Sequence, residues 1–282
     1  MVPKFKTYNN FNGESLTKDI IITHPGSAHF DEFFAISLIL SVHDDKTFEI
    51  FRREPLEDEL RNPDIWVVDI GGQHNEKLKN FDHHQDLDTK SSFVIVADHL
   101  KLSSKMEIFD WWVYKDKIDR FGPIKVGKEM HINNLMQTYS PFEEWYLEYF
   151  ARNPNDCIDL MKAFGKCILK EADELYEGIL FWKNSDVHLI KNKTVRVGLT
   201  DDTKGALEYC NSLAKPFEIT VSFDKRGEGW TLKRYNDNPS VNFYRIAGHK
   251  DIKFAHIGGF IAKTKKRIPI EDVLNLVELS ID

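Results

Sequence analysis

The chain has 282 residues, of which 41% are hydrophobic and 29% are charged, and its formal net charge at pH 7 is -7. These proportions are typical of a soluble globular protein with one large or two ordinary domains, and no stretch approaches the roughly 18 apolar residues of a membrane span. The charge divides into -10 for residues 1–185 and +3 for residues 186–282. The chain therefore lacks the broad basic face of proteins that coat long nucleic acid, whereas its acidic N-terminal part suits bound cations.

Strand and helix patterns alternate in the first seventy residues. Strands are predicted at residues 18–24, 46–53 and 64–70, and a helix at 30–42. The third strand is continuous enough to be buried on both faces. Such alternation favours a parallel sheet, where ligands gather at the carboxyl ends of the strands. His24 and Asp69 stand at two of those ends.

Helical patterns dominate residues 91–182, and the last of them, 155–182, predicts a long connecting helix. Beyond it the pattern is again mixed. Strands are predicted at 186–190 and 194–199, a hairpin at 217–223 and 229–235, and helices near 203–213 and 269–280. The turn-like "KNSD" before the first of these strands places a domain boundary there, between residues 1–185 and 186–282.

The cysteines and the N-terminal segment bear on location. Cys157, Cys167 and Cys210 have no close paired spacing, so neither a disulfide framework nor a cysteine zinc site is indicated. The N-terminal segment has no apolar stretch of the kind that a secretory signal needs. We therefore expect a cytoplasmic protein with no membrane partner.

Ligand-type side chains gather at the predicted strand ends and in the segments behind them. They are His24, His29, Asp31, Asp69, Asp82, His83, His84, Asp116 and Asp119. Imidazoles and carboxylates without thiolates suit Mn²⁺, Mg²⁺, Fe²⁺, Co²⁺ or Zn²⁺. The candidates exceed the needs of one ion, and two ions about 3.5–4 Å apart around a shared carboxylate would use them. Each histidine taken alone also has a plain structural interpretation.

Four motifs, "HPGSAHFD", "VVDIGG", "FDHHQ" and "IDRFG", follow one another in the order and rough spacing of the DHH phosphoesterase superfamily. Within it the chain most resembles the Myg-type (melanocyte-proliferating-gene) family, whose members are described as exonucleases. The C-terminal segment "WTLKRY…HIGGFIAKTK" is also similar to the end of that family. The resemblance implies a parallel-sheet DHH-type N-terminal domain, a helical connector and a smaller α/β, DHHA1-like C-terminal domain. "DRF" departs from the family, which more often has a small polar pair after the aspartate.

The resemblance also implies roles for individual residues. His24 and His29 would bind one ion, Asp31 and His83 the other, and Asp69 would bridge the two. Asp119 would complete the second site, with Asp116 as a competitor. His84 would face the substrate in a catalytic role, steadied by Asp82. The two ions would be divalent, with Mn²⁺ favoured over Mg²⁺ or Co²⁺.

The C-terminal part is expected to bind the substrate. The resemblance singles out His256 with Gly258 and Gly259, whose backbone N–H groups would approach a phosphate, and Arg234 and Lys263 would add charge-assisted hydrogen bonds. A tight packing turn and a solvated basic face are the plainer interpretations of this segment.

The implied function is a two-metal phosphodiesterase, an exonuclease that hydrolyses short RNA or DNA to mononucleotides with a metal-bridging hydroxide as the nucleophile. One alternative is a phosphoesterase for dinucleotides, nucleotide monophosphates or pyrophosphate. Another is a metal-stabilised binding protein without turnover. The expected partner is a short nucleic acid or a nucleotide, and a homodimer is left open.

Overall fold

The computed structural model describes residues 8–9, 15–16, 18–131 and 141–282. The chain divides into two compact units, Met1–Ala172 and Asp173–Asp282. In the described ranges no helix has the length and apolar character needed to cross a membrane.

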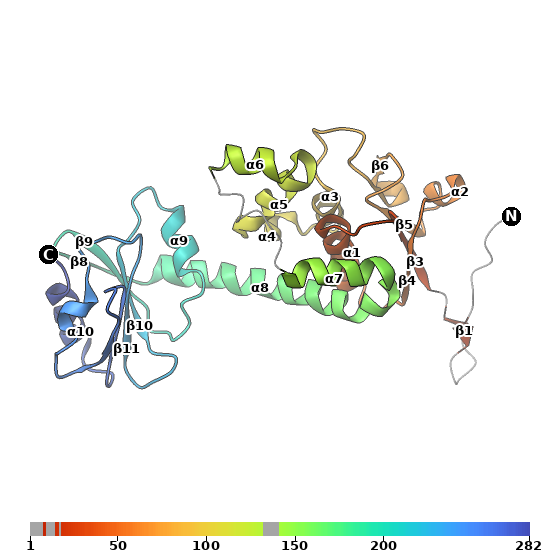
Figure 1. The fold of residues 1–282 in the computed structure, drawn as a ribbon. Coiled ribbons are helices and arrows are strands. Elements are labelled where there is room, and N and C mark those ends of the chain that lie inside the picture. Colours follow the sequence, from red (N-terminus) through yellow and green to blue (C-terminus); the bar gives the residue numbers. More distant parts are fainter. Residues whose placement is uncertain (1–7, 10–14, 17, 132–140) are drawn as a thin grey trace. The chain divides into compact units, whose positions relative to one another are not determined.

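The first unit is built on a five-stranded sheet in the order β4-β3-β5-β7-β6 (Figure 1). Its strands are β3 (Asp19–Thr23), β4 (Phe48–Arg52), β5 (Ile65–Val68), β6 (His74–Asn75) and β7 (Asn80–Phe81). The first four in this spatial order pair in parallel, and only β6 is antiparallel. The predicted parallel pairing is therefore present, and every residue of β5 is buried, as its apolar run indicated. The carboxyl ends of β4, β3, β5 and β7 consequently meet at one edge of the sheet.

Helix α1 (Phe30–Val42) is the central helix of the first unit and has the predicted bounds. It is buried from Asp31 to Ser41, because apolar residues occur all round the helix rather than on one stripe. The ring of Phe34 contacts the rings of Phe93, Trp111 and Phe164 from three other helices. A side chain at Gly165 would collide with the carbonyl oxygen of Ser37, so the long helix passes directly against α1 at that point.

The other helices of this unit follow in chain order. They are α2 (Glu57–Leu60), α3 (Ser92–His99), α4 (Ser103–Met106), α5 (Asp110–Phe121), α6 (Pro123–Glu129), α7 (Pro141–Arg152) and the first half of α8 (Ile158–Asn184). Short 3-10 turns occupy Glu76–Leu78 and Pro154–Cys157, and a two-stranded ribbon pairs β1 (Tyr8–Asn9) with β2 (Ser15–Leu16). The helical stretch predicted for residues 91–182 is thus present in the described ranges.

The second unit has a six-stranded sheet in the order β12-β13-β11-β10-β9-β8. Its elements are β8 (Asp186–Ile190), β9 (Lys193–Val197), α9 (Ala206–Ser212), β10 (Ile219–Phe223), β11 (Trp230–Arg234), a 3-10 turn at Phe243–Ile246, β12 (Ile252–Ala255), β13 (Ile261–Thr264) and α10 (Ile270–Leu279). The predicted hairpin is present as β10 and β11. Strands β12 and β13 were not predicted.

The division between the units falls within α8, earlier than the boundary predicted after residue 185. The reason is the packing of the second half of this helix. Trp182 is fully buried with Phe217 and Tyr235 of the second unit, and Gly178 lies against the backbone of Lys204. The first half of α8 therefore belongs to the first unit, and its second half packs in the core of the second unit.

Candidate metal centre

The candidate ligands converge at the carboxyl edge of the parallel sheet. His24 follows β3, Asp69 follows β5 and His83 follows β7 by two residues. His29 is the N-cap of α1, and Asp31 lies in its first turn. The described residues contain three groups of histidines and carboxylates whose ligand atoms all lie within 4.8 Å of one another. These groups are His24–His29–Glu32–Asp69, Asp69–His83–His84 and Asp31–His83–Asp119.

Asp69 is the residue through which the groups meet. Its Oδ2 lies 3.6 Å from Nε2 of His24, and its Oδ1 lies 3.5 Å from Nε2 of His83. The residue has a φ of 59°, in the left-handed region that aspartate tolerates better than most residues. Its N–H donates to the carbonyl of Phe81, and its Oδ1 accepts from the hydroxyl of Ser92. The backbone therefore leaves β5 in a conformation that turns one carboxylate toward both groups.

His83 is surrounded by three carboxylates. Its Nε2 lies 2.9 Å from Oδ2 of Asp119, 3.3 Å from Oδ2 of Asp31 and 3.5 Å from Oδ1 of Asp69. Asp31 is itself held by the N-terminus of α3, because the backbone N–H groups of Ser92 and Phe93 donate to its two oxygens. The Asp31–His83–Asp119 group therefore combines a residue of α1, a residue of α5 and a residue of the segment after β7.

The pKa values of the buried ligand-type side chains are shifted in the directions expected where several carboxylates attract a cation. Burial and the carboxylates of Asp69 and Asp119 raise the pKa of Asp31 well above its usual range. Burial opposes the charged form of His83, yet the surrounding carboxylates of Asp119, Asp31 and Asp69 raise its pKa to about 12. Burial likewise opposes charge on His24, but Glu32 and Asp69 raise its pKa to about 9. The carboxylates thus favour positive charge at His24 and His83.

The donor set fits a divalent metal ion. Nε2 of His24 and Nε2 of His83 are buried and, among the described residues, have no hydrogen-bond partner of good geometry, although oxygens lie 2.9–3.6 Å away. Ligand atoms about 2.1 Å from a common centre are about 3.0–3.4 Å from one another and point at the centre, not at each other. Such short approaches without hydrogen bonds are what converging ligands produce.

His84 differs from its neighbour in exposure and in partners. Its side chain is 64% exposed, and Asp82 contacts it twice, through the backbone N–H at 3.0 Å and through Nδ1 at 2.8 Å. The other oxygen of Asp82 accepts from the N–H of Gly72. Burial opposes ionisation of Asp82, but these hydrogen bonds lower its pKa to about 2, so it is a carboxylate that holds Nδ1 protonated. Nε2 of His84 is then the ring nitrogen that can accept a proton.

Asp116 and Asp119 lie one helical turn apart on α5 but have different surroundings. Asp119 approaches His83, whereas Asp116 is outside the three groups. Asp116 accepts from the N–H of Ser91 at 2.9 Å and pairs with Arg120 at 2.7 Å. Arg120 also donates to the carbonyl of Leu87, in the loop that follows His84. The departure of "DRF" from the family pattern thus has a structural explanation, since Arg120 ties α5 to that loop.

Replacement of each aspartate by asparagine should separate these two roles. Asp116→Asn leaves the buried guanidinium of Arg120 without its anion and should lower the free energy of unfolding by about 3 kcal/mol. Asp119→Asn should lower it by less, about 1 kcal/mol, because the side chain is partly exposed and His83 keeps Asp31 and Asp69 as neighbours when Asp119 loses its charge. It should instead weaken Mn²⁺ binding about 100-fold. Denaturant unfolding without metal and Mn²⁺ titration measure the two effects, and a reversed pattern would make Asp116 the ligand.

The predicted substrate-binding residues all belong to the second unit, but most of their polar groups already have partners. The N–H of Gly258 donates to Nδ1 of His256, and the N–H of Gly259 donates to the carbonyl of His256. The expectation that these amides are free for a phosphate is therefore not met. The glycines are explained by the turn, because Gly259 has a φ of +71° and a side chain there would collide with Asn242.

The two basic residues of this set are also paired within the second unit. Arg234 donates to the carbonyl of Val241 and to Asp237, and Lys263 donates to Asp224. His256 remains half-buried against the ring of Phe260, with Nε2 as its protonated nitrogen when neutral, since Nδ1 accepts a hydrogen bond. The role of this set in substrate binding stays a prediction.

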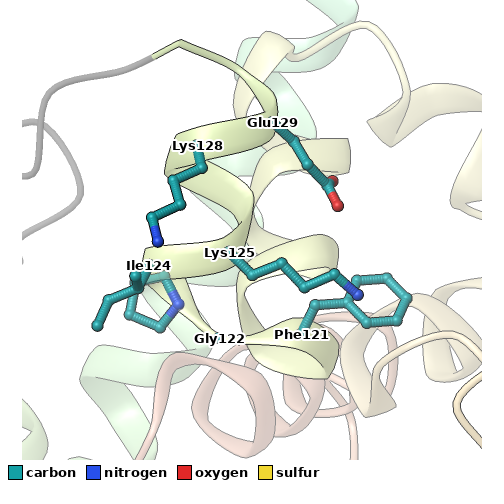
Figure 2. Close-up of a pocket in the computed structure, with 7 residues that line it drawn as sticks. Phe121, Gly122, Ile124, Lys125, Lys128 and Glu129 are labelled. Carbon is teal, nitrogen blue, oxygen red and sulfur yellow. The ribbon is translucent and has the colours of Figure 1, made fainter.

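A cavity of about 500 Å³ lies at the junction of α5 and α6 (Figure 2). It is lined by Phe121, Gly122, Pro123, Ile124, Lys125, Lys128 and Glu129. None of these is a candidate ligand. The ammonium of Lys125 lies 4.6 Å from the centre of the Phe121 ring, and the guanidinium of Arg120 lies 4.7 Å from it. The phenylalanine of the "DRF" segment is thus flanked by two cations rather than by ligands of the metal centre.

Three residues that support the site are not among the ligand-type residues gathered from the sequence. Glu32 belongs to one of the three groups, Ser92 donates to Asp69, and Arg52 pairs with Glu32 at 3.1 Å. The serine pair before the apolar run "FVIVA" is a helix-start signal that indicates α3, whose N-terminus holds Asp31. Arg52 is the last residue of β4, and the parallel pairing of β4 with β3 brings it to the site.

Comparison with known proteins bears on the same region. The family model MYG1_exonuc, described as an uncharacterised protein family (UPF0160), matches residues 20–121. This match agrees with the resemblance of the sequence to the Myg-type family. The matched segment begins in β3 and ends with α5, so it contains every residue of the three groups. No curated protein matches the chain.

Proposed function

We propose that this chain is a metal-dependent phosphodiesterase that removes mononucleotides from an end of short RNA or DNA strands. The observation that carries the proposal is the pair of ligand groups that share Asp69 at the carboxyl edge of a parallel sheet. The Myg-type family supports it, since its model is named for an exonuclease. The same family resemblance favours a DHH-type first domain and a DHHA1-like second domain.

The ligands divide between two cations in this proposal, and the family resemblance favours Mn²⁺ over Mg²⁺ or Co²⁺. His24 and His29 would hold the first ion, Asp31, His83 and Asp119 the second, and Asp69 both. Divalent ions bound there would lower the pKa of water toward 7 and neutralise charge on a phosphoryl group.

The chain's own residues contribute orientation and a proton acceptor. The N-terminus of α3 holds Asp31 in place through two backbone N–H groups, so that carboxylate need not reorganise when the substrate arrives. Asp82 fixes the ring of His84 with Nε2 free of protein hydrogen bonds among the described contacts, at the exposed side of the buried cluster. His84 is therefore placed to meet the substrate and to hold or release a proton at Nε2.

A panel of short substrates tests the proposal. We expect oligonucleotides labelled at the 5′ or the 3′ end to yield mononucleotides with Mn²⁺, less product with Mg²⁺, and none with a chelator. His83→Ala should lose the activity, because it removes the ligand that meets three carboxylates. Product analysis on denaturing gels also gives the direction of degradation.

The panel separates the alternatives as well. Hydrolysis of dinucleotides with none of longer strands would replace the exonuclease by a small-molecule phosphoesterase. Bound metal without hydrolysis of any phosphodiester would indicate a metal-stabilised binding protein. Full activity of His83→Ala would contradict the proposed site altogether.

A further inference from the structure

Two adjacent arginines at the end of β4 each hold the glutamate that begins a different helix. Arg52 pairs with Glu32 of α1, and Arg53 pairs with Glu59 of α2. Each glutamate is the third residue of its helix and accepts the N–H of the N-cap residue, His29 or Leu56. Both pairs join an arginine to a glutamate in the first turn of a helix. Of these two helices, only α1 carries members of the ligand groups.

The Arg52 pair is the more buried of the two. The side chain of Arg52 is 5% exposed and that of Glu32 is fully buried, whereas the side chain of Arg53 is 41% exposed. The guanidinium of Arg52 also lies 5.0 Å from the ring centre of Phe150. A buried pair of this kind costs desolvation, and it contributes net stability only if the geometry is good and its remaining hydrogen-bond sites are satisfied. We therefore consider which parts of the site the Arg52–Glu32 pair holds in position.

Arg52 holds the loop that carries both histidines of the first group. Its Nη2 donates to the carbonyls of Gly26 at 3.3 Å and Ser27 at 3.2 Å, within the segment between His24 and His29. Through Nη1 it holds Glu32, whose two oxygens accept the N–H of His29 at 2.9 Å. One guanidinium thus reaches the middle of the loop and, through Glu32, its end.

Glu32 also approaches the first histidine of the loop. Its Oε1 lies 3.1 Å from Nε2 of His24 and 3.1 Å from Nη1 of Arg52. The arginine therefore compensates the charge of a buried carboxylate that shares a ligand group with a second carboxylate, Asp69. Without Arg52, Glu32 would lose the guanidinium that pairs with it, and the loop would lose its hydrogen bonds at Gly26 and Ser27.

We propose that Arg52 is a positioning residue of the metal centre, which acts through Glu32 to set the loop that presents His24 and His29 to the first cation. The inference rests on the metal site of the proposed function but not on the reaction. Groups that orient metal ligands typically contribute 10–100-fold to affinity, and Arg52 is suited to this task because its planar fork can hold a carboxylate and two carbonyls at once.

Manganese titration of chelator-treated full-length protein tests the proposal, with calorimetry for affinity and elemental analysis for stoichiometry. We expect the unaltered chain to bind two Mn²⁺ ions. Arg52→Met should weaken one of them by about 10–100-fold and leave the other unchanged. Arg52→Lys, which keeps the charge but not the fork, should fall between. Arg53→Met is the matched control, since it removes the neighbouring pair with Glu59, and it should bind both ions normally.

A double-variant cycle shows whether Arg52 acts through Glu32. In a Glu32→Gln background, Arg52→Met should cause a smaller further loss of Mn²⁺ affinity than in the unaltered chain, because only the contacts of Arg52 with Gly26 and Ser27 remain to be removed. Denaturant unfolding of the metal-free variants identifies any loss of folding, and Arg52→Lys keeps the test informative if Arg52→Met does not fold.

The possible results divide cleanly. Equal Mn²⁺ binding by Arg52→Met and the unaltered chain, or an equal loss in Arg53→Met, would overturn the inference and leave the proposed function standing. Two bound ions with the expected Arg52 effect but no hydrolysis would overturn the function alone. An unaltered chain that binds no Mn²⁺ would overturn both.

Discussion

Asp69→Asn is expected to reduce the rate of Mn²⁺-dependent nucleotide release by about three orders of magnitude or more. Asp69 belongs to two of the three ligand groups, with one oxygen near His24 and the other near His83. An amide keeps the shape of the side chain but removes the charge and replaces one oxygen by a hydrogen-bond donor. The electrostatic contribution of a metal centre to phosphoryl chemistry is several kcal/mol, and each 1.36 kcal/mol is tenfold in rate.

The substitution should not disturb the fold. Asparagine adopts the left-handed conformation of residue 69 as readily as aspartate does, and the backbone hydrogen bond from this residue to Phe81 is retained. Elemental analysis should find fewer than two ions in the variant, which separates loss of metal from loss of substrate binding.

Asp64→Asn is the matched control, because Asp64 precedes β5 at its amino end, as Asp69 follows it at the carboxyl end, and its side chain is exposed. We expect this variant to have normal activity and metal content. Retention of most of the activity by Asp69→Asn would show that the shared carboxylate is not part of the reaction centre.

Phe34→Ala is expected to lower the free energy of unfolding of the first unit by about 3–5 kcal/mol. Phe34 is fully buried, and its ring meets those of Phe93, Trp111 and Phe164. Truncation removes these contacts and leaves a cavity between four helices. These helices cannot all move inward to fill it, so the lost contacts are not replaced. Guanidinium unfolding followed by circular dichroism measures the change.

Phe142→Ala provides the comparison, since the side chain of Phe142 is 69% exposed, and it should change the free energy of unfolding by less than about 1 kcal/mol. Similar losses in both variants would show that the core around α1 is less tightly packed than the ring contacts indicate. Phe34→Leu, which retains much of the volume, should recover part of the stability.

Local patterns were sufficient for the main elements of the fold. The helix at 30–42 and the strand at 186–190 have the predicted bounds, because an apolar run of helical length and a short alternating run are read from neighbouring residues alone. Strand β7 was not predicted, since two residues carry no periodicity. It is nevertheless the element that delivers His83 and His84 to the sheet edge, through its parallel pairing with β5.

The sequence by itself determined which chemical groups are available and that they follow strand ends. Imidazoles and carboxylates at His24, Asp69 and His83 are enough to predict a metal site, because ligand type and position along a strand are local properties. The sequence did not decide between Asp116 and Asp119, which lie on the same helix one turn apart.

That decision belongs to the tertiary structure. The orientation of α5 brings Asp119 to His83, and the pairing of Asp116 with Arg120 and Ser91 removes it from the cluster. The anchoring of the His24–His29 loop by Arg52 likewise depends on β4 lying beside β3. Contacts between residues distant in the chain are set by how elements pack, and the pattern within one element does not contain that information.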